Sequence, residues 1–215
     1  MRTEMAGGAS ASDYVLAVDV DGVLVHPSPN LGGAWDSRIQ EDLGIDPKAL
    51  GTKFFREHWQ DVIVGRRDLR ESLAAVLPAL HPEVTVQDFL AYWFTNDGTV
   101  DQEVAAELLD WRKRRGGRTA AVTNQEQYRV AYLRESKGFD ELFDHIAWSG
   151  DIGVTKNSLD FYKIVNSRLG VDPAQVWFFD DDPRNVEVAL DAGWHAFHFV
   201  GVHRMQEVLA TIPIV

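Results

Sequence analysis

Asp19 and Asp21 stand two residues apart at the end of an unbroken apolar run, and Gly22 follows them directly. The run starts at Tyr14, is short and rich in valine, and predicts a strand that is buried on both faces. Two carboxylates at ~4 Å repel each other by about 4 kcal/mol at an effective dielectric constant of ~20. A bound cation or a reaction would explain why they are placed there, whereas the plainer interpretation is a turn or a helix N-cap.

Further polar side chains follow other predicted strands or begin helices, at Thr123, Asn124, Lys156, Asp180 and Asp181. The carboxyl ends of parallel strands meet at one edge of a sheet, where ligands bind, so we expect these side chains to gather near Asp19. Several carboxylates cannot ionise together at one place without a cation. Because the chain has no cysteine, oxygen or imidazole must hold the metal, and oxygen ligands favour Mg²⁺.

The same residue types are suited to phosphoryl transfer. A lysine, a threonine hydroxyl and backbone N–H groups can hold an anion. An aspartate beside a metal-bound phosphoryl group can attack the phosphorus atom and form an aspartyl-phosphate. Phosphoryl transfer needs mainly positioning and neutralised oxygen atoms, which a metal ion and a lysine provide.

The elements that must position these residues alternate between helix and strand from about residue 99. The predicted strands after the first are 118–122, 146–148, 176–179 and 195–200, with helices between them. This alternation indicates an α/β fold with a parallel, Rossmann-like sheet, right-handed crossovers and helices on both faces.

Residues 36–97 differ, because they carry helical apolar stripes and no convincing strand. We expect an α/β core formed by residues 14–25 and 99–215, and an all-helical insertion at 26–98 with a small core of its own. Residues 1–13 are small and polar, and we expect them to be partly disordered.

Composition narrows the class of protein. The 215 residues are 45% hydrophobic and 25% charged, as in a soluble protein of one domain with a modest insertion. The net charge of −12 argues against a nucleic-acid or acidic-membrane partner. No apolar stretch is long enough to span a bilayer, the first residues lack the apolar segment of a signal peptide, and the absence of cysteine fits a cytoplasmic protein.

Four segments resemble, in order, the motifs of the haloacid dehalogenase superfamily of phosphohydrolases. They are residues 19–24 (Asp-Val-Asp-Gly-Val-Leu), 120–124 (Ala-Ala-Val-Thr-Asn), 153–158 (Gly-Val-Thr-Lys-Asn-Ser) and 179–186 (Phe-Asp-Asp-Asp-Pro-Arg-Asn-Val). The resemblance covers residues 14–200. The helical insertion at 26–98 lies where this family places its small helical cap.

The resemblance implies a role for each residue of the first two motifs. Asp19 is the nucleophile and Asp21 the general acid and base. Both bind Mg²⁺, Asp19 through its carboxylate and Asp21 through its backbone carbonyl. The Thr123 hydroxyl and the backbone N–H of Asn124 hold phosphate.

The third and fourth motifs supply the remaining charges. Lys156 neutralises the nucleophile and the phosphate, although Asn157 stands where the family usually has proline. Asp180 and Asp181 are acids of the metal site. We assign the third acid, Asp182, to helix capping.

Asp21 also bears on the reaction class. Family members that cleave carbon–halogen bonds or phosphonates typically lack this second aspartate, since only an ester oxygen needs an acid to protonate it. We therefore expect a Mg²⁺-dependent phosphatase that acts on a small phosphorylated metabolite through an aspartyl-phosphate. The alternatives are a phosphomutase acting on a sugar phosphate and a non-catalytic phosphate-binding regulatory protein. The oligomeric state is left open.

Other candidate groups receive a plainer interpretation. The basic run at 112–118 is interpreted as a helix C-terminus, and His195 and His198 as structural residues of a strand. Arg66 and Arg67, in a loop of the insertion, are either contacts for a second anionic group or surface charges. The residues near the hinges that could line the pocket are Trp35, Trp93 and Asn96.

Overall fold

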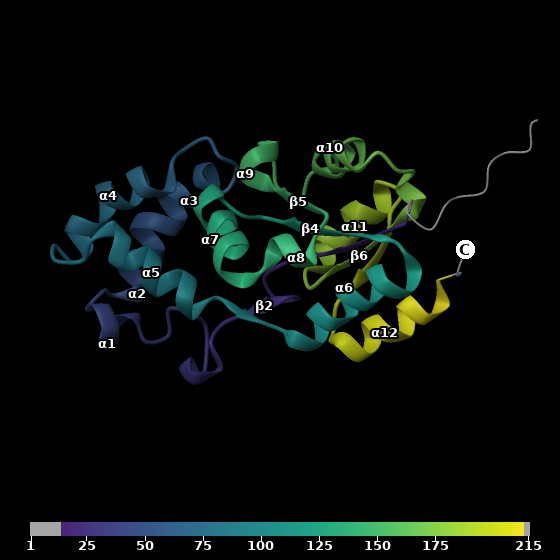
Figure 1. The fold of residues 1–215 in the computed structure, drawn as a ribbon. Helices are drawn as coiled ribbons and strands as arrows, with labels where there is room; N and C mark the ends of the chain where they lie inside the picture. The colour runs from purple at the N-terminus through teal and green to yellow at the C-terminus, as the bar shows by residue number, and fades with distance from the viewer. Residues whose placement is uncertain (1–13, 213–215) are drawn as a thin grey trace, which may run out of the picture.

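A five-stranded parallel sheet forms the centre of the larger unit. The computed structural model describes residues 14–212 (Figure 1). The strand order is β5-β4-β1-β6-β7. The strands are β1 (Val15–Val18), β4 (Arg118–Thr123), β5 (His145–Trp148), β6 (Val176–Asp180) and β7 (His195–His198). All four side chains of β1 are fully buried, as the apolar run predicts.

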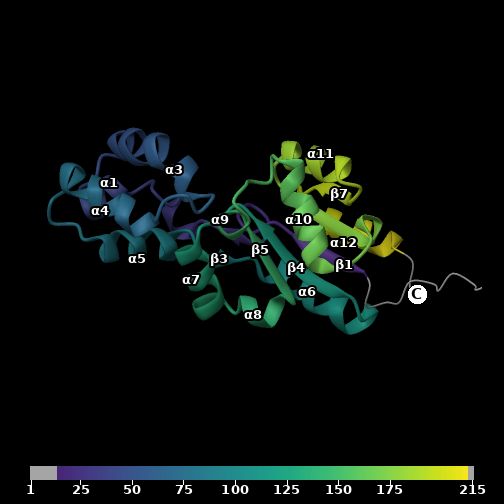
Figure 2. The ribbon, with the colours of Figure 1, turned by 90° about the horizontal axis from the view of Figure 1, so that it is seen from above.

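Helices cover both faces of this sheet (Figure 2). One face packs against α6 (Gln102–Arg115), α7 (Gln127–Lys137), α8 (Phe139–Leu142) and α12 (Val202–Thr211). The other face packs against α10 (Leu159–Leu169) and α11 (Pro183–Asp191). Successive residues of β1 alternate between the two apolar clusters, as side chains of a strand must. The predicted α/β fold with a parallel sheet is thus confirmed.

The first strand is shorter than its apolar run predicts. It ends at Val18, because the chain turns at Gly22, where φ is +81° and glycine is favoured. Strand β2 (Val25–His26) then pairs antiparallel with strand β3 (Thr99–Val100). This pairing was not predicted from the sequence. This two-stranded ribbon connects the larger unit with the helical insertion (Figure 1).

The insertion is entirely helical between these two short strands, within the part of the chain that the structure describes. Its elements are η2 (Pro29–Leu31), α1 (Ile39–Leu43), α2 (Pro47–Leu50), the π-helical η3 (Gly51–Arg56), α3 (Glu57–Val62), α4 (Leu69–Leu80) and α5 (Val86–Asn96). The Asp46 side chain caps α2, and Pro47 is its first residue, as predicted. Buried side chains of these helices form a third apolar cluster.

Two short elements connect the core strands and helices, α9 (Ser149–Ile152) after β5 and η4 (Pro173–Gln175) before β6. The expectation that residues 1–13 are partly disordered concerns a segment outside the described residues. Among the helices of residues 14–212, none has the length and apolarity needed to cross a membrane.

Candidate active site

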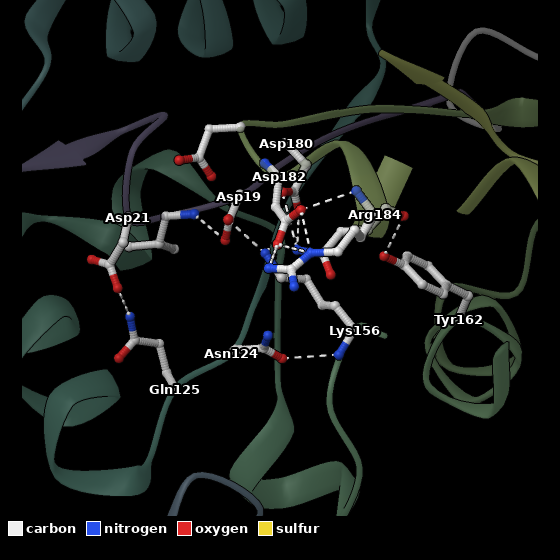
Figure 3. A network of polar contacts seen from close by, with 12 residues as sticks. Asp19, Asp21, Asn124, Gln125, Lys156, Tyr162, Asp180, Asp182 and Arg184 are labelled. Atoms are coloured by element: carbon white, nitrogen blue, oxygen red, sulfur yellow. Dashed lines mark hydrogen bonds and ion pairs between the residues drawn. The ribbon is translucent and has the colours of Figure 1, made fainter. Parts of the chain in front are cut away.

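Lys156 joins two of the predicted acids in the interior of the protein (Figure 3). Its Nζ atom lies 2.5 Å from Asp19 Oδ2 and 2.7 Å from Asp180 Oδ2. All three residues are buried: Asp19 is 7% exposed, Lys156 1% and Asp180 0%. The ends of β1 and β6 supply the acids, and the loop before α10 supplies the lysine, so segments far apart in the sequence meet here.

Asp19, Asp180 and Asp181 offer oxygen atoms that all lie within 4.8 Å of one another. Lys156 balances only part of their negative charge, and an all-oxygen donor set suits a hard divalent cation such as Mg²⁺. Gly22 is required beside this cluster, since a Cβ atom there would lie 2.2 Å from Asp181 Oδ2. The residues present therefore fit a metal ion.

Burial governs the protonation of this cluster. Desolvation raises the pKa of Asp19, while the charge of Lys156 limits the rise. Desolvation also raises the pKa of Asp181, and the charge of Asp180 adds to it. For Lys156, burial alone would lower the pKa, but the charges of Asp19 and Asp180 outweigh burial and raise it. A divalent cation would favour the ionised carboxylates.

The Asp21 carboxylate lies apart from this cluster and faces other partners. It accepts a hydrogen bond from Gln125 Nε2 at 2.5 Å, and its Oδ1 lies 3.7 Å from Arg129 Nη2. The side chain is 49% exposed. Desolvation by its surroundings raises the pKa of Asp21, and the Arg129 charge opposes this. A carboxyl group placed in this way can hold a proton near the nucleophile and release it.

Thr123 and Asn124 stand at the carboxyl end of β4, as predicted. Thr123 is buried. The Asn124 side chain accepts a hydrogen bond from the backbone N–H of Lys156 at 2.9 Å. Asn124 thereby fixes the loop that carries the lysine, a contact that the sequence analysis did not predict.

Sequence analysis missed several residues that hold the acids. Asn185 donates from Nδ2 to both carboxylate oxygens of Asp180, at 3.1 and 3.3 Å. Gln125 and Arg129 hold Asp21. Asn185 lies within the fourth motif, and Gln125 and Arg129 follow the second motif closely in sequence, which is the signal that could have indicated them. Asp182 accepts from Arg184 N at 2.9 Å and caps α11, as predicted.

A cleft of about 420 Å³ leads to this site between the insertion and the core. Trp59, Gln60 and Ile63 of the insertion line one side, and Asp21 and Asn124 belong to the other. The helical insertion therefore borders the site as a cap does, and we refer to residues 26–98 as the cap.

The other candidate residues lie in different surroundings. Arg66 pairs with Asp61 at 2.8 Å, and neither Arg66 nor Arg67 lines the cleft. Trp93 lines a small cavity that adjoins the cleft, and Trp35 stacks on Trp93 at 4.9 Å within the cap. The backbone carbonyl of Asn96 accepts from Ser28 N, which fixes the hinge.

The histidine pair and the basic run have structural contacts. His195 stacks on Trp177 at 4.4 Å, and His198 Nε2 lies 3.0 Å from the carbonyl oxygen of Asp181. From the basic run, Arg112 donates to the carbonyl oxygen of Glu141 at 2.7 Å. These contacts agree with the predicted structural roles.

A parallel sheet with acids and a lysine at its carboxyl edge, bordered by a helical cap, defines a class of capped α/β enzymes. A model of one protein family, described as haloacid dehalogenase-like hydrolase, matches residues 15–193. The chain belongs to this family. A search of curated proteins found no match.

Solved structures share the fold. A HAD family enzyme from Bacteroides thetaiotaomicron in a magnesium complex has a TM-score of 0.73 and 16% identity, covering 86% of this chain and 92% of that one. A HAD phosphatase from Thermococcus onnurineus has a TM-score of 0.61 and 19% identity, covering 91% and 97%. A structure described as a dehalogenase has a TM-score of 0.66 and 15% identity, covering 93% and 98%. At these identities the likeness establishes the fold.

Proposed function

We propose that this protein is a Mg²⁺-dependent phosphohydrolase that acts on a small phosphomonoester through an aspartyl-phosphate. One observation carries the proposal: Asp19 pairs with Lys156 inside an acidic cluster, while a second carboxylate, Asp21, lines the cleft beside it. The HAD family enzyme from Bacteroides thetaiotaomicron, solved with magnesium and, in a second structure, with magnesium and inorganic phosphate, supports it.

Each residue has a defined role in this reaction. Asp19 attacks phosphorus, forming an oxygen–phosphorus bond while the bond to the leaving oxygen breaks. Asp21 gives its proton to that leaving oxygen, then removes a proton from the water that hydrolyses the aspartyl-phosphate. Lys156 offsets negative charge on Asp19 and on the phosphoryl group.

The metal site and the phosphate contacts complete the proposal. Asp19, Asp180 and Asp181 would hold Mg²⁺, which supplies positive charge to the phosphoryl oxygens. We assign phosphate binding to the Thr123 hydroxyl and the Asn124 backbone N–H. The 420 Å³ cleft suits a small phosphorylated metabolite, and the cysteine-free chain fits action in the cytoplasm.

The test is hydrolysis of an aryl phosphate in the presence of Mg²⁺. Asp19→Asn should abolish turnover without loss of the fold, and EDTA should abolish it in the native protein. Asp160→Asn is the matched control, because the Asp160 side chain is 72% exposed, pairs with Lys163 and does not line the cleft. Undiminished turnover after the Asp19 change or in EDTA would reject the mechanism.

Parallel assays separate this reaction from the others open to the family. Release of inorganic phosphate supports hydrolysis, whereas an isomerised sugar phosphate would show a phosphomutase. Halide release from a haloacid would show a dehalogenase. Binding of phosphate analogues with no turnover would show a regulatory protein.

A further inference from the structure

Arg129 is a buried arginine for which the proposed reaction has no role of its own. It lies in the first turn of α7 and is only 4% exposed. Because a buried arginine must be paired, its contacts indicate what it does. We propose that Arg129 is a positioning residue: anchored on the end of the cap, it holds the Asp21 carboxyl group in the orientation that proton transfer requires. The inference rests on the proposed phosphohydrolase function.

The Arg129 guanidinium is anchored on the end of the cap. It donates to the backbone carbonyl of Phe94 at 3.1 Å and to that of Asp97. Phe94 belongs to the last turn of α5, and Asp97 directly follows that helix, where carbonyl groups lack helical partners and favour a cation. The Cζ atom also lies 5.4 and 5.6 Å from the ring centroids of Phe94 and Tyr132. These contacts fix the position of the charge.

The same guanidinium faces the proposed acid. Its Nη2 atom lies 3.7 Å from Asp21 Oδ1. On the other carboxylate oxygen, Asp21 Oδ2 accepts a hydrogen bond from Gln125 Nε2 at 2.5 Å (Figure 3). The Asp21 side chain is 49% exposed, so little else restrains it. A partner beside each oxygen therefore sets the direction in which the carboxyl group points.

The distance between Arg129 and Asp21 leaves the acid able to carry a proton. At 3.7 Å the pair is longer than a hydrogen bond, because the carbonyls at the end of the cap hold the guanidinium. Asp97 Oδ2, at 3.9 Å, shares the same charge. A guanidinium that closed on Asp21 would keep it ionised, whereas the first step needs its proton.

The start of α7 joins the acid to the cap at more than one residue. Besides Arg129, Tyr128 donates from its hydroxyl to Asp68 Oδ2 at 2.6 Å. Asp68 belongs to the cap, where its side chain caps α4. Tyr128 lines neither the cleft nor the small cavity beside it, whereas Arg129 lines that cavity together with Asp21. Tyr128 therefore offers a control that loosens the cap without changing the partners of Asp21.

Orientation decides how well Asp21 serves the reaction. The carboxyl group must reach the leaving oxygen in the first step. A misplacement of ~1 Å can lower a rate about 10²-fold. A leaving group that is stable as an anion departs without the proton, so its departure does not depend on that orientation. The identity of the leaving group therefore reports on the placement of Asp21.

The experiment compares two esters of nearly the same shape. 4-Nitrophenyl phosphate releases a stable phenolate, whereas 4-nitrobenzyl phosphate releases an alcohol that must be protonated. We expect Arg129→Gln to lower kcat/KM for the benzyl ester at least about tenfold more than for the phenyl ester. The comparison uses kcat/KM because it covers the steps up to departure of the leaving group. A merely structural loss would lower both values by one factor.

Two further measurements show whether Arg129 acts through Asp21. In single turnovers of the Asp21→Asn protein, where the acid is absent, adding Arg129→Gln should change the rates for both esters by the same factor. Tyr128→Phe removes the hydrogen bond to Asp68 and should likewise affect both esters equally.

Arg129→Lys is the second variant, in case Arg129→Gln does not fold. Lysine keeps the buried positive charge but lacks the planar fork, so it cannot hold two carbonyls and face Asp21 at once. The same selective loss for the benzyl ester is expected in this variant. Urea denaturation of each variant shows that the protein assayed is folded.

Failure of this inference can be told from failure of the proposed function. Hydrolysis of both esters by the native protein, with equal losses for the two in the folded Arg129 variants, would overturn the inference alone. A selective loss that persists in the Asp21→Asn background, or that Tyr128→Phe reproduces, would overturn it as well. No hydrolysis of either ester by the native protein would reject the proposed function and the inference with it.

Discussion

Lys156 is the positive charge that lies between the two most buried aspartates of residues 14–212, Asp19 and Asp180. With the lysine present, Asp19 and Asp180 each have a partner within 2.7 Å. Breaking a buried pair by removing one partner leaves an uncompensated charge, which costs about 3–5 kcal/mol. The lysine therefore supports the fold as well as the proposed chemistry.

Lys156→Met should accordingly lower the free energy of unfolding by about 3–5 kcal/mol, measured by urea denaturation at pH 7 without metal. Lys163→Met is the matched control. Lys163 is 63% exposed and pairs with an exposed aspartate, so its loss should change the free energy by less than about 0.5 kcal/mol. Equal effects of the two substitutions would contradict the role of Lys156.

At the residue scale, sequence reasoning reached the groups that carry charge but not the groups that hold them. Asp19, Lys156 and Asp180 were predictable because their motifs end strands or begin helices. Asn185 and Arg129 were not, because a neutral amide or an arginine on a helix gives no sign of its distant partner. Their roles depend on the three-dimensional contacts with Asp180 and Asp21.

At the scale of elements, a loop of the cap contacts α9 of the core. Ser149 Oγ donates to the carbonyl oxygen of Ile63 at 2.6 Å, and this contact is buried. Gly65 follows in the same loop with φ of +70°, and a Cβ atom there would lie 2.2 Å from the carbonyl oxygen of Gly150. At this contact between the cap and the core, the Gly65 position has room only for glycine.

Gly65→Ala should be more damaging than the same change at a glycine with open space around it. Gly138 has φ of +71°, and no atom lies within 4 Å of an added Cβ atom. Gly138→Ala should therefore lower the free energy of unfolding by about 1–2 kcal/mol, through the backbone conformation alone. Gly65→Ala should lose about 1–3 kcal/mol more, because the loop must shift. Urea denaturation of both variants measures the difference, and equal losses would show that the contact is unimportant.

The strands and helices themselves were largely predictable, because apolar periodicity and capping residues act locally. The ends of β1 and the β2–β3 ribbon were not. The apolar run to Val25 continues past a turn at Gly22, and two-residue strands have no periodicity of their own. Their pairing depends on where the cap brings residues 25 and 99 together.

At the scale of the whole molecule, acidic residues are in excess and three of them converge on one site. A cation that binds only the folded protein stabilises it through mass action. Sequence alone predicted the excess of charge and the sheet edge where the acids would meet. It did not predict the shape of the cleft, which depends on how the cap packs against the core.

Mg²⁺ should therefore raise the stability of the native protein, by about 2.7 kcal/mol at 100 times its dissociation constant. Thermal unfolding with and without Mg²⁺ measures this, with NaCl of matched ionic strength as the control. Asp181→Asn should abolish most of the shift, and without metal it should unfold no more easily than the native protein, because a like charge has been removed. An undiminished shift in this variant would contradict the assigned metal site.

The central claim is that Asp19 becomes phosphorylated during turnover. Rapid acid quenching of the Mg²⁺-loaded enzyme with an aryl phosphate, followed by mass spectrometry of its peptides, tests this directly. The account predicts one added phosphoryl group on the peptide that contains Asp19 and none in the Asp19→Asn protein. A phosphoryl group on another residue, or turnover by the Asp19→Asn protein, would contradict it.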